Sequence, residues 1–223
     1  MLRVFIGYDR QEPVAYHVLA HSILRRSSIP LAIAPLKREL LGKLYRRARG
    51  PTESTEFSLT RFLVPALSGY QGWSVFMDCD MLCKMDFALV AKEIRRQARK
   101  AVLVCKHDYM PSSKRKFLNH VQTVYPRKNW SSLMIFNNAK CRALSPHYVN
   151  TATGLDLHRF NWIRNEQIGE LPIEWNWLVG EYKYNPRAKV VHYTLGGPWF
   201  RKYRDCDYAS EWRAEQKLAQ RAG

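Results

Sequence analysis

The sequence contains no apolar run of the length that a membrane-spanning helix requires, which is about eighteen residues. Its first residues lead directly into an expected strand at 4–6 and show no hydrophobic core of a signal peptide. The five cysteines include no pair in the Cys-x-x-Cys spacing, which argues against a disulfide framework and a zinc ribbon. We therefore expect a cytoplasmic protein with reduced thiols, either free or attached peripherally to the inner face of a membrane.

Acidic residues are also scarce. There are 19 Asp and Glu against 36 Lys and Arg, which gives a formal net charge of +17. Such a field concentrates anionic partners near the surface. A single basic run is more often a solvated face, but several runs in one chain favour binding to an anionic membrane or to nucleic acid such as DNA. The runs are Lys37, Arg38, Lys43, Arg46, Arg47 and Arg49; Arg95, Arg96, Arg99 and Lys100; Lys114, Arg115 and Lys116; and Arg201, Lys202 and Arg204.

Short apolar stretches alternate with amphipathic ones along the chain. Strands are expected at 4–6, 31–36, 74–77, 101–105, 131–136 and 189–192, and helices at 56–67, 86–100 and 212–221, with a further helix after the first strand. Residues 106–129 read as a long basic loop, and no repeat or linker divides the chain. This alternation predicts an α/β fold, with residues 1–223 forming a single three-layer αβα domain around a mostly parallel sheet.

Two aspartates, Asp78 and Asp80, directly follow the expected strand at 74–77. The carboxyl end of a strand is where ligands bind in open α/β sheets, and carboxylate oxygens suit Mg²⁺ or Mn²⁺. Two acidic residues in a turn are common, so the pair has a purely structural alternative. A phosphotransferase with Asp78 as nucleophile is disfavoured, because Leu82 stands where that signature has Thr or Val.

Five segments of the chain carry a family pattern. They are VFIGYD (4–9), TEFSLTRF (55–62), FMDCD (76–80), WSSLMIFN (130–137) and HYTLGGPW (192–199). In these segments the chain resembles GT-A-fold glycosyltransferases, especially family eight and its bacterial relatives. The resemblance implies a GT-A-like, Rossmann-like domain and a retaining hexosyltransferase that uses a nucleotide diphosphate sugar, expected to be a UDP-sugar, with Mn²⁺ or Mg²⁺.

The resemblance also implies roles for individual residues. Asp78, Asp80 and His192 match the metal ligands, and Tyr8 with Asp9 matches the pocket of the nucleotide base. Ordinary alternatives for these and the other matched residues are turn glycines, strand-end hydrogen bonds and a surface ion pair for Arg61. The residues implied to bind the donor or its metal are Tyr8, Asp9, Ser58, Arg61, Asp78, Cys79, Asp80, Ser132, Gly196, Gly197 and Trp199.

The catalytic pair implied by the resemblance is Glu166 and Gln167, where Glu replaces the Asp that is usual in the family. Further along the chain, the residues Trp175, Asn176 and Trp177 are expected either to wall the acceptor site or to pack in the core. The side chains around residue 166 would then lie beside the reacting carbon of the donor sugar.

The acceptor is expected to be lipopolysaccharide, another glycan or a lipid-linked acceptor. Two alternatives remain open at this stage. One is a glycosyltransferase that modifies a hydroxymethyl base in DNA, which would have to flip its target out of the helix. The other is a non-catalytic nucleic-acid-binding domain, although no helix-turn-helix, RRM or zinc-finger pattern is present.

Overall fold

A computed structural model describes residues 1–50, 53–112, 115, 118 and 125–221 of the chain. Its centre is a six-stranded sheet in the order β2-β1-β3-β6-β5-β7. The strands are β1 (Leu2–Gly7), β2 (Leu31–Leu36), β3 (Trp73–Met77), β5 (Val102–Cys105), β6 (Leu133–Asn137) and β7 (Ile168–Leu171).

Five strands of this sheet run in one direction. β1 pairs in parallel with β2 and β3, and β5 pairs in parallel with β7, whereas β6 is antiparallel to both β3 and β5. The expected mostly parallel α/β fold is therefore confirmed. The carboxyl ends of β1, β3, β5 and β7 lie at one edge of the sheet, and the segments that enter these strands lie at the opposite edge.

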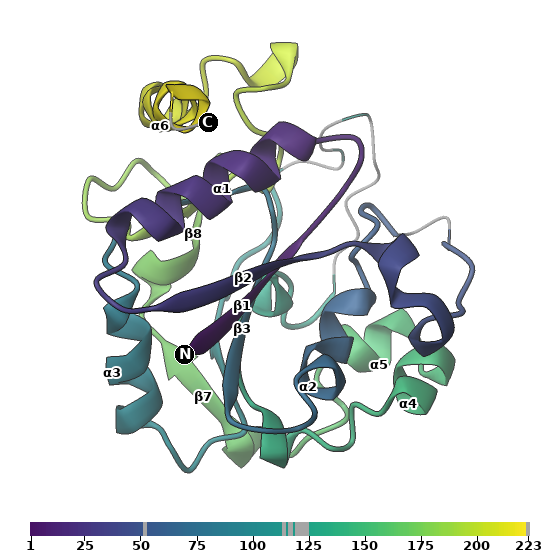
Figure 1. Cartoon of the computed structure of the whole chain (residues 1–223). Coiled ribbons are helices and arrows are strands. Elements are labelled where there is room, and N and C mark those ends of the chain that lie inside the picture. Colours follow the sequence, from purple (N-terminus) through teal and green to yellow (C-terminus); the bar gives the residue numbers. More distant parts are fainter. Residues whose placement is uncertain (51–52, 113–114, 116–117, 119–124, 222–223) are drawn as a thin grey trace.

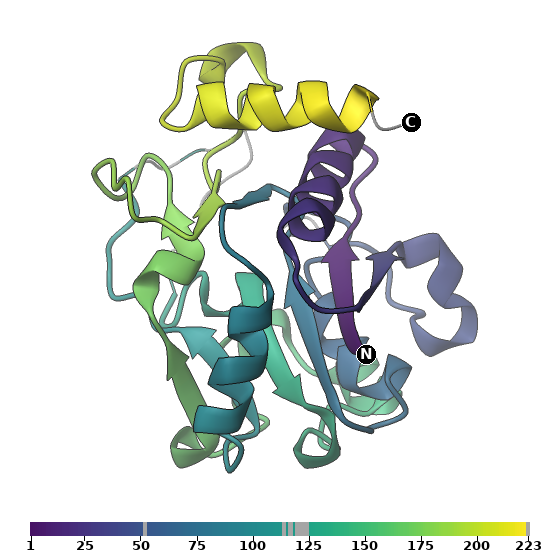
Figure 2. The same ribbon diagram turned by 60° about the vertical axis from the view of Figure 1, so that its left-hand side comes forward.

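Helices cover both faces of the sheet. α1 (Pro13–Arg26) and α3 (Ala88–Arg96) lie on one side, and α2 (Val64–Leu67), α4 (Pro146–Thr151) and α5 (Gly154–His158) lie on the other (Figures 1 and 2). The C-terminal helix α6 (Ala209–Arg221) packs on the outside of α1 (Figure 2). This arrangement is the three-layer αβα architecture that the alternating pattern predicts.

The core follows from the apolar strands. Val4 and Ile6 of β1 are fully buried, and the central strands β3, β5 and β6 are buried along almost their whole length. Strands covered on both faces read as continuous apolar runs. α1 buries one stripe that includes Ala15, Leu19 and Ile23, which accounts for the amphipathic pattern after the first strand.

A second, three-stranded sheet stands beside the first. It contains β4 (Met81–Cys83), β9 (Val190–His192) and β8 (Trp177–Leu178), in the order β4-β9-β8. The expected strand at 189–192 therefore exists but does not extend the large parallel sheet. It pairs antiparallel with β4, so that the segment after Asp80 and the segment that ends at His192 lie side by side.

Several expected elements differ from the structure. The helix expected over 56–67 is a 3₁₀ turn, η2 (Thr60–Leu63), followed by the single turn α2, because Pro65 fits only the first turn of a helix. The strand expected from residue 131 begins at Leu133, and the last helix begins at Ala209. Much of the loop expected at 106–129, with Lys114 and Lys116, lies outside the described residues. Among the residues that the structure describes, no helix is long and apolar enough to cross a membrane.

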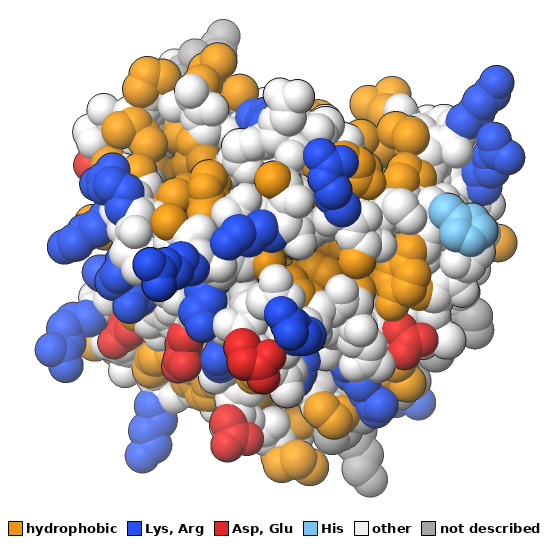
Figure 3. Space-filling view, turned by 90° about the horizontal axis from the view of Figure 1, so that it is seen from below, with side chains coloured by type: hydrophobic (Ala, Val, Ile, Leu, Met, Phe, Trp, Pro, Cys, Tyr) orange, Lys and Arg blue, Asp and Glu red, His pale blue; other side chains and the backbone are white. Residues whose placement is uncertain are grey.

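The basic character is visible on the surface. Figure 3 views the molecule from below, where Lys and Arg side chains are more numerous than acidic ones. The carboxyl end of α3 points to this side of the molecule, and Arg95, Arg96 and Arg99 in and after it are exposed. This basic group therefore lies away from the edge at which β3 ends.

Candidate metal centre

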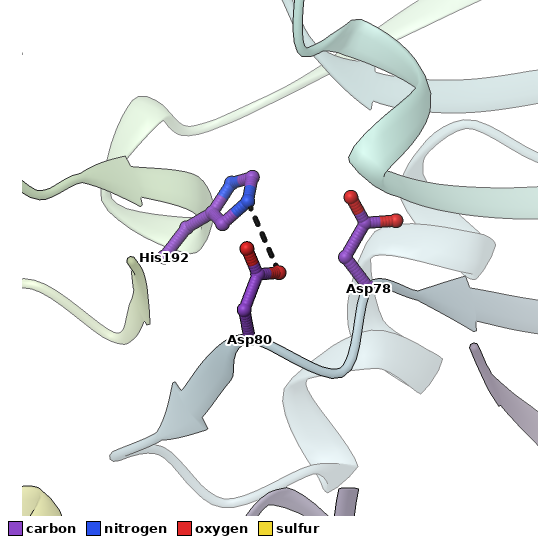
Figure 4. A group of neighbouring side chains, drawn as sticks. All are labelled: Asp78, Asp80 and His192. Carbon is purple, nitrogen blue, oxygen red and sulfur yellow. Dashed lines mark ion pairs between the residues drawn. The ribbon is translucent and has the colours of Figure 1, made fainter. Parts of the chain in front are cut away.

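Three side chains from distant parts of the sequence converge at the carboxyl edge of the large sheet. Asp78 and Asp80 occupy the turn between β3 and β4, and His192 ends β9 (Figure 4). The backbone N–H of Tyr193 donates to the carbonyl of Asp80 at 2.9 Å, which locks the two segments together. One ligand atom from each of the three residues lies within 4.8 Å of the others.

A hydrogen-bond network fixes the orientation of His192. Asn176, at the end of η7 (Ile173–Asn176), is fully buried, and its Nδ2 donates to the carbonyl of Asn129 at 3.2 Å and to Ser132 Oγ at 2.8 Å. A carbonyl can only accept, so the amide oxygen of Asn176 must be the atom 2.9 Å from His192 Nδ1. The Nδ1 atom therefore carries a proton, and Nε2 of a neutral ring offers a lone pair.

The Nε2 atom faces Asp80 Oδ1 at 3.3 Å. In the neutral ring both atoms are electron-pair donors, and they repel each other unless a proton or a metal cation lies between them. Two carboxylates and one imidazole are a donor set suited to Mn²⁺ or Mg²⁺, and a ligating histidine characteristically donates its other N–H to an oxygen. The residues present therefore fit the divalent cation that the sequence predicts.

Arg61 supports the first aspartate. Its guanidinium lies 2.8 Å from Asp78 Oδ1 and also donates to the backbone carbonyls of Phe57 and Ser131 at 3.2 and 2.9 Å. It is 5% exposed and stacks over the ring of Phe76 at 4.9 Å. The alternative of a surface ion pair is wrong, because the arginine is a buried, rigid group that orients Asp78.

The three ligands open into a cavity of about 520 Å³, a volume typical of small-molecule sites. One wall comes from Arg47, Gly50 and residues 53–61, and the other from residues 125–132 and 153–159. Besides the three ligand residues, the lining includes the basic Arg47, Arg61, Lys128 and Arg159, the acidic Glu53 and the hydroxyl-bearing Thr55, Ser58, Ser131, Ser132, Thr153 and Thr194. The cavity offers hydrogen-bond partners and positive charge to a polar, anionic ligand.

Six of the residues singled out from the sequence line this cavity. They come from four separate segments, which the fold brings together at one place. They are Ser58, Arg61, Asp78, Asp80, Ser132 and His192. Ser132 has a double role, because its carbonyl accepts from the backbone N–H of Asp78 at 2.9 Å and its hydroxyl accepts from Asn176.

Glu166 and Gln167 are not part of this site. They lie in η6 (Asn165–Gln167), immediately before β7, and their carbonyls accept from Lys100 Nζ at 2.7 Å and from the N–H of Ala101 at 2.9 Å. β7 is parallel to β3, so the residues that enter β7 lie at the edge opposite to the one at which β3 delivers Asp78. The structure therefore does not bring them to the cavity, and their catalytic role stays a prediction from the sequence.

Tyr8 and Asp9 lie at the expected edge, after β1, but outside the lining of the cavity. Asp9 is 1% exposed, and its carboxylate accepts from the backbone N–H groups of Gln11 at 2.9 Å and Glu56 at 3.0 Å. It therefore ties two loops together instead of presenting a free edge to a base. Tyr8 is half-buried, with Lys37 Nζ 5.4 Å from its ring centre, and its face stays available to a ligand only in part.

The other expected donor residues serve the core or the turn beside it. Cys79 is buried and its thiol donates to Glu12 at 3.6 Å, and burial raises the pKa of this thiol well above its usual value. Gly196 has φ 134°, and a Cβ at Gly197 would meet the ring of Trp199 at 2.0 Å. The two glycines are thus required by the turn and by Trp199, which packs on Trp212 with ring centres 5.1 Å apart.

Other residues at the site were not singled out from the sequence, or were given another role. Asn176 and Trp175 were expected either at the acceptor wall or in the core; both are buried, Asn176 against His192. His158 lines the cavity from α5, 2.7 Å from Ser131 Oγ, and burial raises the pKa of the neighbouring Tyr125 to about 12. The sequence offered one signal for this wall, the Thr153 helix cap, whose hydroxyl accepts from the N–H of Asp156.

Solved glycosyltransferases share this fold. The bifunctional glycosyltransferase WbbM superposes with a TM-score of 0.66 at 16% identity, over 96% of this chain and 49% of that one. The galactosyltransferase LgtC, solved with donor and acceptor sugar analogues, gives 0.58 at 10% identity over 97% and 95% of the two chains. GlyE of Streptococcus pneumoniae TIGR4 gives 0.60 at 12% identity over 96% and 59%. The chain thus spans about half of WbbM, and the likeness to all three is one of GT-A-type fold.

The sequence itself has a nearer relative. No protein-family model matches the chain. Protein CDI of Arabidopsis thaliana is 47% identical over 224 aligned residues, which cover 96% of this chain and 86% of that protein. Identity at this level along nearly the whole length means that the chain belongs to the same family as Protein CDI.

Proposed function

We propose that the chain is a metal-dependent glycosyltransferase, similar to family eight, that transfers a hexose from a nucleotide diphosphate sugar to a glycan. The proposed donor is a UDP-sugar, the proposed cation Mn²⁺ or Mg²⁺, and the proposed outcome retention of the anomeric configuration. Lipopolysaccharide and lipid-linked glycans are acceptors of the proposed class. Residues 1–223 would form one catalytic domain.

The observation that carries this proposal is the set of ligands around His192. Asn176 holds the proton on Nδ1, so Nε2 presents its lone pair to the same point as the carboxylate of Asp80. A buried imidazole that faces a carboxylate in this tautomer is well suited to a shared cation. The cavity beside this group has polar and basic walls, which supports binding of the diphosphate of a sugar donor there.

In this proposal the residues of the chain position the donor, and the bound cation supplies Lewis-acid stabilisation of the departing diphosphate. Arg61 holds Asp78 in place through its ion pair and its two bonds to backbone carbonyls. Ser132 and Asn176 hold Asp78 and His192 from the other side. Ser131 and His158, joined at 2.7 Å, provide hydrogen-bonding groups for the hydroxyls of a sugar in the cavity.

The proposal is tested with a panel of UDP-, GDP- and dTDP-sugars, each with Mn²⁺ or with EDTA. We expect one donor to stabilise the protein against heat and to release nucleoside diphosphate slowly, both only with the metal. Asp80→Asn is expected to abolish both effects. Asp205→Asn, at a surface aspartate that is 77% exposed, serves as the matched control and is expected to behave as the wild type.

Binding of no donor in the presence of Mn²⁺ would contradict the proposal. If duplex DNA were then bound tightly, the basic surface would be the functional feature and the chain a nucleic-acid-binding domain. Donor turnover that persists in Asp80→Asn would refute the role of the metal centre while leaving a metal-independent transferase.

A further inference from the structure

Two leucines are exposed to solvent in the short 3₁₀ segment that precedes the cavity-lining residues Arg47 and Gly50. In η1 (Arg38–Leu44), Leu40 is 74% exposed and Leu44 is 41% exposed. Single exposed leucines are ordinary on protein surfaces, but these two lie only four residues apart, on either side of a kink at Gly42, whose φ is 51° and ψ −124°. Figures 1 and 2 both show the segment after β2 at the outer side of the molecule, outside the helices that cover the sheet.

The element is firmly held. Leu41 and Tyr45 are buried in the core, and the ring of Tyr45 lies under the guanidinium of Arg38 at 5.5 Å. The side chain of Asn150 in α4 accepts from the N–H of Arg46 at 2.7 Å and donates to the carbonyl of Leu44 at 2.9 Å. The exposure of Leu40 and Leu44 therefore does not come from a loosely attached loop. Leu40 and Leu44 are exposed although their sequence neighbours Leu41 and Tyr45 are buried.

Cations surround these leucines. Lys43, Arg46 and Arg49 are exposed, and Lys37 precedes the helix with 40% of its side chain exposed. Glu39, an acidic residue within η1, pairs with Arg10 at 2.7 Å and with Lys37 at 3.4 Å, so it offsets part of the charge of both. Apolar side chains ringed by lysine and arginine are the pattern of surfaces that rest in the interface of an anionic bilayer.

The position of η1 matters as much as its composition. The chain that leaves η1 runs directly into the cavity wall, where Arg47 and Gly50 line the site. Arg47 is fixed there by its bond to the carbonyl of Val149 at 3.1 Å. A surface that rests on η1 therefore lies close to the cavity that holds Asp78, Asp80 and His192.

We propose that η1, with the cations beside it, docks the protein on an anionic lipid bilayer and so brings the cavity to a membrane-borne acceptor. The statement about the acceptor rests on the proposed function, whereas the docking itself does not. Leucine gains nothing from the phosphates of a nucleic acid but is stabilised when it enters the acyl boundary, so the exposed pair favours a membrane over DNA. The basic group after α3 lies elsewhere and has no exposed leucine among its residues 95–100.

The experiment is co-sedimentation of the full chain with phosphatidylcholine vesicles that contain or lack phosphatidylglycerol. We expect binding only to the anionic vesicles, weakened by salt. Leu40→Ser combined with Leu44→Ser is expected to lower the partition coefficient at least about tenfold. Lys43→Glu combined with Arg46→Glu is expected to lower it by a similar factor.

Matched pairs of changes test the place of docking. Leu24 and Leu218 are 57% and 40% exposed on α1 and α6, so serine at both removes nearly as much exposed apolar surface without touching η1. Arg95→Glu with Arg99→Glu makes the same charge change at α3. Both control pairs are expected to retain wild-type partitioning.

The proposal is overturned if the η1 leucine pair binds vesicles as the wild type does, or if the α3 pair abolishes binding. Binding to duplex DNA that is tight and insensitive to the leucine changes would also overturn it and favour a nucleic-acid surface. The leucine pair should keep metal-dependent donor release in the absence of vesicles. A protein that binds vesicles through η1 but releases no nucleotide from any donor would refute the proposed function and leave the docking surface intact.

Discussion

Asn176 illustrates how an uncharged residue can govern a charged site. Its amide oxygen determines which nitrogen of His192 holds the proton, and its Nδ2 is committed to Asn129 and Ser132. Replacing it with alanine leaves Nδ1 of His192 without an acceptor, so the ring can adopt the tautomer with its proton directed at Asp80. We expect Asn176→Ala to weaken Mn²⁺ binding about 10- to 100-fold, as measured by titration calorimetry.

Asn137→Ala is the control for this change. Asn137 ends β6 on the opposite edge of the sheet, and its side chain makes a single long bond of 3.4 Å to Ala98. Metal affinity should be unaltered there. Equal Mn²⁺ affinity in Asn176→Ala and the wild type would show that His192 does not depend on this amide, and would weaken the case for His192 as a ligand.

A substitution at Arg61 tests how the site depends on the position of Asp78. Lysine keeps the charge but lacks the planar fork that reaches Asp78, Phe57 and Ser131 together. We expect Arg61→Lys to lower donor turnover by about two orders of magnitude, since a charge near the reacting groups would be displaced by about one ångström. The measurement is kcat and KM for nucleotide release, compared with Arg99→Lys at the exposed α3 group; a change in KM alone would contradict a role in positioning.

At the residue scale, the sequence predicted the candidate metal ligands better than the residues that hold these ligands in place. Asp78 and Asp80 were recognisable because a fully apolar strand precedes them, and a strand ends where ligands bind. His192 lay more than a hundred residues away and was found through the family resemblance. The sequence did not show that Asn176 supports His192. A residue between two tryptophans could equally lie in the core, line the cavity wall or support a metal ligand.

Among the elements, α6 is attached to the body by a buried carboxylate. Glu215 is 2% exposed and binds Arg25 at 2.9 Å, Arg26 at 2.7 Å and His21 Nδ1 at 2.7 Å, all on α1. Burial alone would raise the pKa of Glu215, but the hydrogen bonds from the two arginines outweigh it and lower the pKa to about 2. Together these bonds fasten the C-terminal helix to the layer that covers the sheet.

The lowered pKa of Glu215 predicts how the free energy of unfolding changes with pH. A carboxyl group whose pKa is lowered by folding stabilises the protein above its unfolded pKa, near 4.5, and loses that contribution as the pH falls towards 2. We expect Glu215→Gln to cost about 3 kcal/mol in the free energy of unfolding at neutral pH. The difference from the wild type should shrink as the pH falls below 4.5, in urea titrations at several pH values.

Glu166→Gln serves as the control for Glu215→Gln. Glu166 is exposed and uses its backbone carbonyl, not its side chain, to bind Lys100. It should match the wild type in stability at every pH. A difference between Glu215→Gln and the wild type that stays constant from neutral pH down to pH 2 would show that the glutamate acts through packing and not through its charge.

The elements also show where sequence reasoning fails. The order of most strands of the large sheet was predictable from apolar spacing, although β7, α4 and α5 were not expected. The edge at which a residue lies depends on strand direction, which spacing does not reveal. Glu166 and Gln167 precede β7 by a single turn, and only the parallel pairing of β5 with β7 shows that they face away from Asp78. The antiparallel pair of β4 and β9, which brings His192 to Asp80, was equally invisible in the sequence.

The whole molecule carries a positive net charge, whereas two of the three ligand residues of the candidate metal centre are acidic. The chain carries +17 overall, yet its candidate metal centre gathers two carboxylates within reach of one imidazole. Like charges held close together oppose folding, and Arg61 offsets part of this repulsion through its ion pair with Asp78. A divalent cation would offset the rest, and the diphosphate of a donor would in turn be attracted by the basic field. Folding stability, metal and donor are thereby linked.

The linkage predicts that the metal and the donor stabilise the whole domain together. At a free donor concentration about a hundred times its Kd, binding adds about 2.7 kcal/mol to the free energy of unfolding. For a domain of 223 residues this corresponds to a rise in Tm of about 5–10 °C. We expect this rise in thermal scans with a UDP-sugar and Mn²⁺ together, a smaller rise with Mn²⁺ alone, and none with the UDP-sugar and EDTA. An equal rise with EDTA would mean that the donor binds without the carboxylates of Asp78 and Asp80, and the basic walls of the cavity would then be its main binding groups.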